Sequence, residues 1–526
     1  MTISDIITLV SLIIAILAIL TNKNRDHLLL KFHLVDYILF TGAFTLINYF
    51  VFYDAFFSKG IYIARLYFID FGLKNPKNYA YLISLISLSY FFYKIYYAFY
   101  PNSRLKSVSH FYRRLIESNE SGFLLDLIER YHKKDIVQLV DKSMDDNPDP
   151  DWWMRRLQRE SFKVKAKKAY ARSVAYLFPS SKYNKNGYAM LVMHEVMNDP
   201  AFIALASNQR PYLFAEIFAS FKKNKRRIFP RELVNSFLSQ IIESKNFWLI
   251  KELKQSQDFD GGQPEWFFDQ NRLLASLLKD LSVSDVNEIW RPFGDAAVNE
   301  IEEERTKGYE SKMFQEFRDE QFLWEYRTYY AIQFFQILIT EAIVAKYKNC
   351  HFWLFYYRSI TDAILTTFKK FPPKEFEEVE TVYHKFIDLM IDNIFGWLHT
   401  SNRNNDEEFH LNILDCLGQI IHEICENEFY GEVRKRNVID RLMDLYCTLE
   451  DNSERINVRK EIKAILRKPC MLTDADNSYY SYARVAWERF DRIPHRAGSG
   501  LGDDYDYFAE FKKDVIIPLG FNPDLY

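Results

Sequence analysis

Three long apolar runs within the first hundred residues constrain the fold of this chain more than any other feature. They cover residues 3–20, 34–57 and 79–100 and are 18, 24 and 22 residues long. A membrane-spanning helix needs about 20 predominantly apolar residues to cross about 30 Å of hydrocarbon. We therefore predict three N-terminal transmembrane helices in a membrane domain at residues 1–106.

The first run lacks the features of a cleaved secretory signal. Asp5 is the one charged residue before Lys23, so the run has no positively charged leading region, and Thr21 and Asn22 follow it where a small-x-small cleavage site would stand. We expect this helix to be retained.

Basic residues in the flanking segments predict the orientation of the helices. By the positive-inside rule, the side richer in Lys and Arg is cytosolic. The segments after the first and third runs carry seven such residues against four between the second and third, namely Lys23, Arg25, Lys31, Arg104, Lys106, Arg113 and Arg114 against Lys59, Arg65, Lys74 and Lys77. We predict a multi-pass protein of the inner (cell) membrane whose C-terminal body is cytosolic.

Polar side chains inside the predicted spans are costly to bury in lipid, so their positions are informative. They are Asp36, Asn48, Ser84, Ser87 and Lys94. Such residues on one helix face are typical of helix packing, and a pore lining in an oligomer is the alternative. Asp36 and Lys94 both lie near the predicted cytosolic end, so an ion pair between them is expected; the alternative is that Lys94 extends alone to the headgroups.

The remainder of the chain predicts an all-α fold. Only 16 Gly and 16 Pro occur, so few tight turns are available, and apolar residues recur at i, i+3, i+4 and i+7 in segments such as 232–244, 408–425 and 438–449. We predict a large cytosolic helical array. Its successive helices suggest an α-solenoid, although no fixed repeat is present. A boundary at Gly261 and Gly262 would divide it into domains at 107–260, with a basic helix, and 261–526.

One later apolar segment, residues 330–345, resembles a fourth span. It contains Gln333, Gln336 and Glu341 and is too short to cross a bilayer. We predict instead the central buried helix of the second soluble half.

Composition excludes several classes of site. The net charge is −3, the five cysteines form no CxxC pair, and no nucleotide-binding, zinc-protease or serine-hydrolase motif occurs. No cofactor and no metal site are predicted.

Two basic clusters are candidate binding surfaces. A solvated helix face, contact with anionic lipid headgroups and binding of nucleic acid are the three interpretations, and the membrane tether favours lipid over nucleic acid. The clusters comprise Arg155, Arg156, Arg159, Lys163, Lys165, Lys167, Lys168 and Arg172, followed by Lys222, Lys223, Lys225, Arg226 and Arg227.

Arg403 and Asn404, followed by His410 on the next predicted helix, resemble the Arg and His motif of HEPN ribonucleases. The resemblance covers these few residues and implies that Arg403 orients a phosphate while His410 acts as acid or base. Pairs with this spacing also arise by chance.

The function expected from these observations is non-enzymatic. A membrane anchor that forms a homo-oligomer would carry a cytosolic helical body that senses a trigger or serves as a scaffold for a protein partner. This outline is similar to bacterial membrane effectors of stress and antiviral defence, an analogy of architecture alone. A membrane-tethered ribonuclease using Arg403 and His410 is the alternative.

Overall fold

The computed structural model describes most of the chain and leaves several segments out. The basic residues at 155–172 and 222–227, the apolar run at 3–20 and the glycine pair at 261–262 lie outside the described part. The described residues are 21–60, 75–101, 104–141, 188–189, 191–192, 196–197, 199–218, 231–245, 247–256, 271–347, 352–372, 380–403, 407–448, 456–471 and 513.

The fold is all-α, as predicted. Within the described ranges every regular element is a helix, apart from one isolated antiparallel bridge between Glu316 and Thr381. Two compact units are present: Met1–Ala206 with residues 224–229, and Ser207–Lys223 with residues 230–526. The boundary between these units falls within α12 (Pro200–Gln209), whereas the predicted boundary at residues 261–262 stays a prediction.

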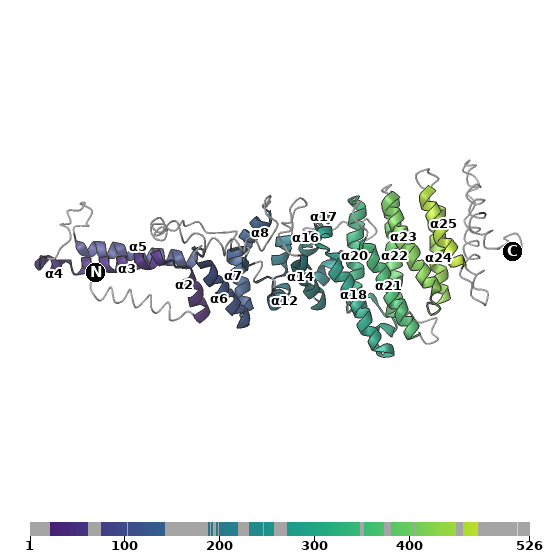
Figure 1. Ribbon diagram of the computed structural model, residues 1–526, viewed down its shortest axis with the longest axis horizontal. Coiled ribbons are helices and arrows are strands. Elements are labelled where there is room, and N and C mark those ends of the chain that lie inside the picture. Colours follow the sequence, from purple (N-terminus) through teal and green to yellow (C-terminus); the bar gives the residue numbers. More distant parts are fainter. Residues whose placement is uncertain are drawn as a thin grey trace, which may run out of the picture. The chain divides into compact units, whose positions relative to one another are not determined.

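The first unit contains an apolar hairpin of α3 (Leu34–Val51) and α5 (Pro76–Tyr96), which lie side by side (Figure 1). Short polar signals begin both helices. The Asn75 side chain accepts a hydrogen bond from the Lys77 amide, with Pro76 in the first helical position. At α3 the His33 side chain and Asp36 form a reciprocal capping box. A short helix, α4 (Tyr53–Ser58), continues from α3.

Shorter helices flank the base of the hairpin. They are α2 (Asn22–Leu30) before it, and α6 (Leu105–Glu117), α7 (Ser121–Leu127), the π-helical turn η2 (Ile128–His132) and α8 (Lys133–Asp141) after it. Amphipathic α6 buries Val108, Phe111, Tyr112 and Leu115 at helical spacing. The α2 helix packs against this helix, so the base of the hairpin has a folded core of its own.

The second unit is a succession of helices, several of which pack against the helix two places along the chain. Contacts join α18 to α20 and α21, α20 to α22, α21 to α23, and α23 to α25 (Figure 1). Its helices are α13 (Pro211–Phe218), α14 (Arg231–Glu243), α15 (Phe247–Gln255), α16 (Arg272–Leu278), α17 (Leu281–Asn287), α18 (Trp290–Thr306), η4 (Gly308–Glu310), η5 (Lys312–Phe314), α19 (Glu320–Leu323), α20 (Arg327–Val344), α21 (Phe352–Lys370), α22 (Val382–Arg403), α23 (Glu407–Glu426), α24 (Glu432–Thr448) and α25 (Ile456–Met471).

Helix α20 is the buried centre that the sequence predicts for residues 330–345. Tyr330, Phe334 and Leu338 have no exposed surface, and the ring of Phe334 stacks on Phe293 of α18 with centroids 3.8 Å apart. The prediction of a buried core helix is therefore confirmed. Whether the helical array continues as a regular solenoid stays a prediction.

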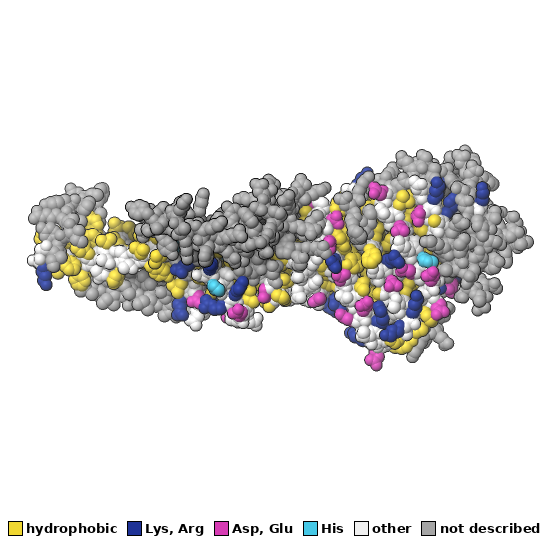
Figure 2. All heavy atoms as spheres, in the orientation of Figure 1, with side chains coloured by type: hydrophobic (Ala, Val, Ile, Leu, Met, Phe, Trp, Pro, Cys, Tyr) yellow, Lys and Arg dark blue, Asp and Glu magenta, His cyan; other side chains and the backbone are white. Residues whose placement is uncertain are grey.

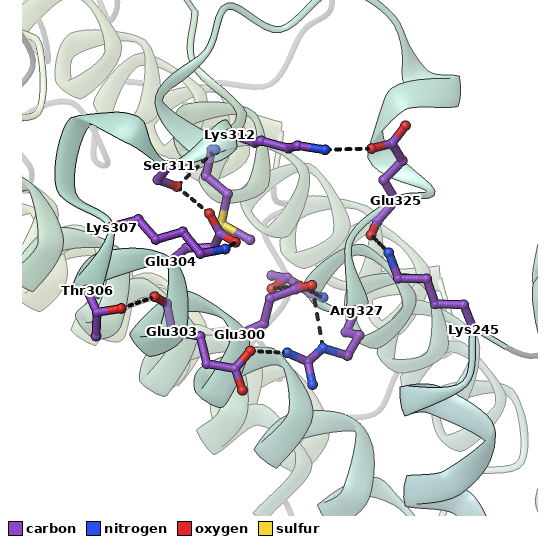
Figure 3. Close-up of polar contacts among 12 residues, drawn as sticks. Lys245, Glu300, Glu303, Glu304, Thr306, Lys307, Ser311, Lys312, Glu325 and Arg327 are labelled. Atoms are coloured by element: carbon purple, nitrogen blue, oxygen red, sulfur yellow. Dashed lines mark hydrogen bonds and ion pairs between the residues drawn. The ribbon is translucent and has the colours of Figure 1, made fainter.

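Carboxylates from α18 satisfy the first turn of α20 (Figure 3). Glu300 accepts hydrogen bonds from the Thr328 amide at 2.8 Å and from the Thr328 hydroxyl at 2.9 Å, and Arg327 Nε lies 3.5 Å from its other oxygen. Backbone N–H groups at a helix start have no partner within the helix. The carboxylate of Glu300 on the neighbouring helix supplies such a partner, and its negative charge interacts favourably with the helix dipole.

A close approach between α18 and α21 depends on Gly294. A Cβ atom there would lie 2.1 Å from Cδ1 of Tyr356, whose ring stacks on Phe335 and whose hydroxyl donates to Asp295 at 2.8 Å. Because the ring is held on both sides, Gly294→Ala should lower the free energy of unfolding by about 1–3 kcal/mol through overpacking.

Gly396 offers the matched control, because nothing lies within 4 Å of a Cβ atom built there. In the exposed middle of α22, Gly396→Ala should raise helix stability by about 0.5–1 kcal/mol. Denaturant unfolding of the two variants measures both effects. Equal midpoints would contradict this account of the α18–α21 contact.

Candidate functional site

The outer surface of the hairpin carries most of the exposed large hydrophobic side chains among the described residues, shown in yellow in Figure 2. Leu39 is 54% exposed, Ile86 60% and Tyr97 72%. Of the large hydrophobic side chains classed as exposed in the described ranges, only Tyr309, Val344, Phe355 and Val433 lie outside residues 29–99. Soluble proteins rarely expose a contiguous apolar patch of this kind, which is typical of a surface that another apolar phase covers.

Inside the hairpin, the polar face of α5 packs toward α3. Ala80, Ser84 and Phe91 are the buried residues of α5, and Ala80 packs against Ile47 of α3. The Ser84 hydroxyl donates to the Ala80 carbonyl at 2.8 Å, so its hydrogen bond stays within the helix. This arrangement favours the packing interpretation for the small residues of α5. Ser87 is half-buried.

The polar face of α3 is placed differently. Thr45 donates to the Thr41 carbonyl at 2.9 Å and Asn48 to the Phe44 carbonyl at 2.8 Å, so both side chains form hydrogen bonds within their own helix. Asn48 is half-buried and Thr45 exposed. The structure thus leaves this face outside the α3–α5 contact.

By length and composition, one helix in the described part of the chain is apolar enough to cross a membrane, α3 at Leu34–Val51. Only 11% of its residues are buried, so it lacks the cover of a core helix. Helix α5 has 21 residues but includes five tyrosines together with Lys77 and Lys94. Tyrosine is favoured at the membrane interface, so the composition of α5 mixes spanning and interfacial character.

A buried ion pair joins the two helices at one end of the hairpin. Lys94 Nζ lies 2.9 Å from Asp36 Oδ2, with side chains 15% and 4% exposed, and the Tyr90 hydroxyl donates to Asp36 Oδ1 at 2.5 Å. Asp36 Oδ2 also accepts from the His33 amide at 2.6 Å. The predicted Asp36–Lys94 ion pair is confirmed, and Asp36 has the additional role of capping α3 that sequence reasoning missed.

Next to this pair, α2 contributes two bases to a buried cluster of rings. Lys31, 1% exposed, donates to the Ile95 carbonyl at 2.7 Å and to the Tyr131 hydroxyl at 3.0 Å. His27 Nδ1 lies 2.7 Å from the Tyr100 hydroxyl. Lys31 therefore connects α2 to the end of α5 and to η2 by hydrogen bonds. We name His27, Lys31, Tyr100, Tyr112, Tyr131, His132 and Tyr188 the junction cluster.

His132 lies at the centre of the junction cluster. Its ring packs against those of Tyr100 and Tyr188, each with its centroid 5.8 Å away, and its Nε2 lies 2.7 Å from the Tyr112 hydroxyl. Tyr188 in turn donates to the Pro101 carbonyl at 2.8 Å. The π-helical turn η2, which widens the helix locally, ends at His132; such turns occur frequently at functional sites.

Burial shifts the pKa values of the bases in the junction cluster downward. Desolvation lowers the pKa of His132 to about 3. For His27, desolvation, with the nearby positive charges of Lys31 and Arg130, also lowers the pKa to about 3. Desolvation followed by repulsion from Arg130 lowers the pKa of Lys31 to about 8. A charged form is thus costly at each of these positions.

The candidate ribonuclease pair is only partly described. His410 is 2% exposed, and its Nδ1 lies 2.9 Å from the Ser401 hydroxyl. Arg403 ends α22, and its side chain lies outside the described residues. An imidazole that serves as acid or base must reach the reacting atoms. Burial of His410 therefore gives the ribonuclease alternative no support, and it stays a prediction, as do the two basic clusters.

The junction cluster could not be found from the sequence, because its members come from four separate segments. Comparisons with models of protein families, with curated proteins and with solved structures find no match for this chain.

Proposed function

We propose that this chain is a multi-pass integral membrane protein with a three-span N-terminal anchor, of which α3 and α5 form two spans, and a cytosolic helical body that senses a trigger or serves as a scaffold. The observation that carries the proposal is the apolar outer surface of the hairpin. Apolar side chains as exposed as those of Leu39 and Ile86 are stable in lipid and unfavourable in water.

The junction cluster supports a sensing role. Lys31, by its bonds to the Ile95 carbonyl and the Tyr131 hydroxyl, ties the membrane hairpin to the helices that follow it within the first unit. A shift of α6 or η2 would therefore change the surroundings of α5. Coupling of this kind needs an element with two arrangements whose equilibrium both sites bias.

Charge on the hairpin surface tests the anchor directly. Ile86→Glu should reduce the fraction of protein that resists alkaline carbonate extraction, because an acidic residue at the centre of a spanning helix costs on the order of 3 kcal/mol. The matched control is Val433→Glu on α24, where an apolar side chain 76% exposed is also replaced by a carboxylate. Equal extraction of the two variants would argue for a hairpin that is not in lipid.

We further propose that the protein acts on the membrane as an effector in bacterial stress or antiviral defence, assembled as a homo-oligomer. Overproduction in bacteria should lower the membrane potential, reported by a voltage-sensitive dye, and Ile86→Glu should abolish the effect. An unchanged potential with the intact chain would oppose this role. Loss of function in Arg403→Gln at an unchanged membrane level would favour the ribonuclease instead.

A further inference from the structure

Helix α3 has two opposite faces, and α5 covers one of them. The buried residues of α3, Asp36 and Ile47, both contact α5. At about 100° per residue, Thr45 lies about 180° around the helix from Asp36. Thr41 and Thr45 are exposed, and Asn48 on the same side is half-buried. These three residues, which we name the polar face of α3, therefore point away from α5.

The polar face has the properties of a contact between membrane helices. Thr45 and Asn48 each donate one hydrogen bond to a carbonyl of their own helix, so the oxygen atoms of both side chains keep lone pairs that can accept another. Polar side chains in a span usually face another helix. Beside them, nothing lies within 4 Å of a Cβ atom built on Gly42, so a neighbouring backbone has room to approach. Leu46 and Phe44, 49% and 50% exposed, flank this narrow strip with apolar surface.

The predicted first span at residues 3–20, which lies outside the described residues, has a matching pattern in its sequence. Apart from Asp5, every residue of this run is either Ile, Leu or Val, or one of five small residues. The small residues recur at alternating intervals of four and three, which places them on one face of a helix. They are Ser4, Thr8, Ser11, Ala15 and Ala18. Membrane helices approach one another most closely through such residues.

The two patterns agree when the helices run antiparallel, as two successive spans do. Thr41, Thr45 and Asn48 are separated by four and three residues, and the small residues of the first run have the same intervals in the reverse order. Setting Ser11 opposite Thr45 brings three further pairs to the same level: Thr8 with Asn48, Ala15 with Thr41, and Ala18 with Ile38. The same register places Leu20, which ends the run, level with Asp36 in the first turn of α3.

We infer that residues 3–20 form a helix that packs antiparallel on the polar face of α3, so that α3 lies between this helix and α5. The inference rests on the proposed membrane anchor and names the occupant of a face that the hairpin leaves open. The connection favours this occupant over a second copy of the chain. One residue joins the run to α2 and three join α2 to α3, so the run has a high effective concentration beside α3.

Disulfide cross-linking of the full-length protein in membranes tests the inference. The five natural cysteines are first replaced by alanine. Ser11→Cys with Thr45→Cys should then form a disulfide within one chain under mild oxidation, detected by the mass of the linked peptides. Facing small residues of packed helices can bring their Cα atoms within the range of about 4.4–6.8 Å that a disulfide needs. Ala15→Cys with Thr41→Cys is a second pair in the same register, in case the first pair alters folding.

Ser11→Cys with Leu46→Cys is the matched control, because Leu46 follows Thr45 directly and points about 100° away around the helix. Its disulfide yield should be several-fold lower than that of Ser11→Cys with Thr45→Cys. An equal yield from the control, or no disulfide within one chain from either facing pair, would overturn the inference. Disulfides that form only between chains would assign the polar face to a second copy.

Carbonate extraction of the same variants separates this inference from the proposed anchor. Protein that resists extraction but forms no disulfide in either facing pair would overturn the packing of the first run and leave the anchor standing. An unaltered chain that carbonate extracts would defeat the anchor itself, and the inference with it.

Discussion

Acidification from pH 6.5 toward pH 3 is expected to lower the stability of the first unit by several kcal/mol. Burial lowers the pKa of both His27 and His132 to about 3. Between pH 6.5 and 3 the unfolded chain binds protons that the folded chain does not, so stability falls as pH falls through this window. Because the pKa of each imidazole is lower in the folded than in the unfolded chain, the two together contribute several kcal/mol.

Amide hydrogen exchange of residues 104–141 as a function of pH measures this effect in the intact protein. The double variant His27→Gln and His132→Gln should keep its protection to lower pH, because glutamine does not titrate. His110→Gln is the control, since His110 is exposed on α6 in the same unit. If the double variant lost protection in the same pH window as the unaltered chain, buried imidazoles would not be the cause.

Removal of one partner of the Asp36–Lys94 ion pair should cost about 3–5 kcal/mol, because the other charge is left buried without a partner. Lys94→Gln removes the ion pair and the contact of the Lys94 ammonium with the Tyr90 ring. Asp36→Asn should cost more, since Asp36 also accepts hydrogen bonds from the Tyr90 hydroxyl and the His33 amide. The double variant Asp36→Asn with Lys94→Gln should be less destabilised than the sum of the two single variants.

The capping role of Asp36 changes what an exchange of charges can achieve. Asp36→Lys combined with Lys94→Asp restores the pair of charges but not the cap of α3, so only part of the stability should return. Membrane accumulation of the two single variants, the neutral double variant and the exchanged pair measures how strongly the effects of the two positions depend on each other. Strictly additive losses would show that the two side chains act independently.

The features that the sequence predicted correctly depend on local periodicity. Helix α20 was identified because polar residues within an apolar segment of that length are incompatible with lipid, and burial of Tyr330 and Leu338 agrees. The Asp36–Lys94 contact followed from the depth of each residue along two antiparallel helices. Both arguments need only the rise of a helix and the thickness of a bilayer.

Helix ends were predicted less well, for identifiable reasons. The apolar run at 34–57 divides at Phe52 into α3 and α4. The helix that contains the run at 79–100 begins earlier than the run, at Pro76, because Asn75 caps it and Pro76 occupies its first position. This helix ends at Tyr96. Beyond Tyr96 the chain leaves the helix. Tyr100 belongs to the same apolar run, but it lies in the junction cluster, where it is 1% exposed. Hydropathy alone does not distinguish a ring in lipid from a ring in a protein core.

The junction cluster could not be predicted because it is built from long-range contacts. Lys31 meets Tyr131, which is 100 residues away in the chain, and Tyr188 meets Pro101. Each isolated His or Lys looks like an ordinary surface residue in a polar segment. Only the fold shows that these side chains share one buried site at the base of the hairpin.

The central claim is that α3 and α5 cross a bilayer in opposite directions, and cysteine accessibility tests it most directly. Lys59 and Lys106 are exposed and lie beyond opposite ends of the hairpin. In a chain whose five natural cysteines are replaced by alanine, Lys59→Cys should react with a membrane-impermeant maleimide in intact cells. Lys106→Cys should react only after lysis. Reaction of both positions in intact cells, or of neither before lysis, would contradict a hairpin that spans the membrane.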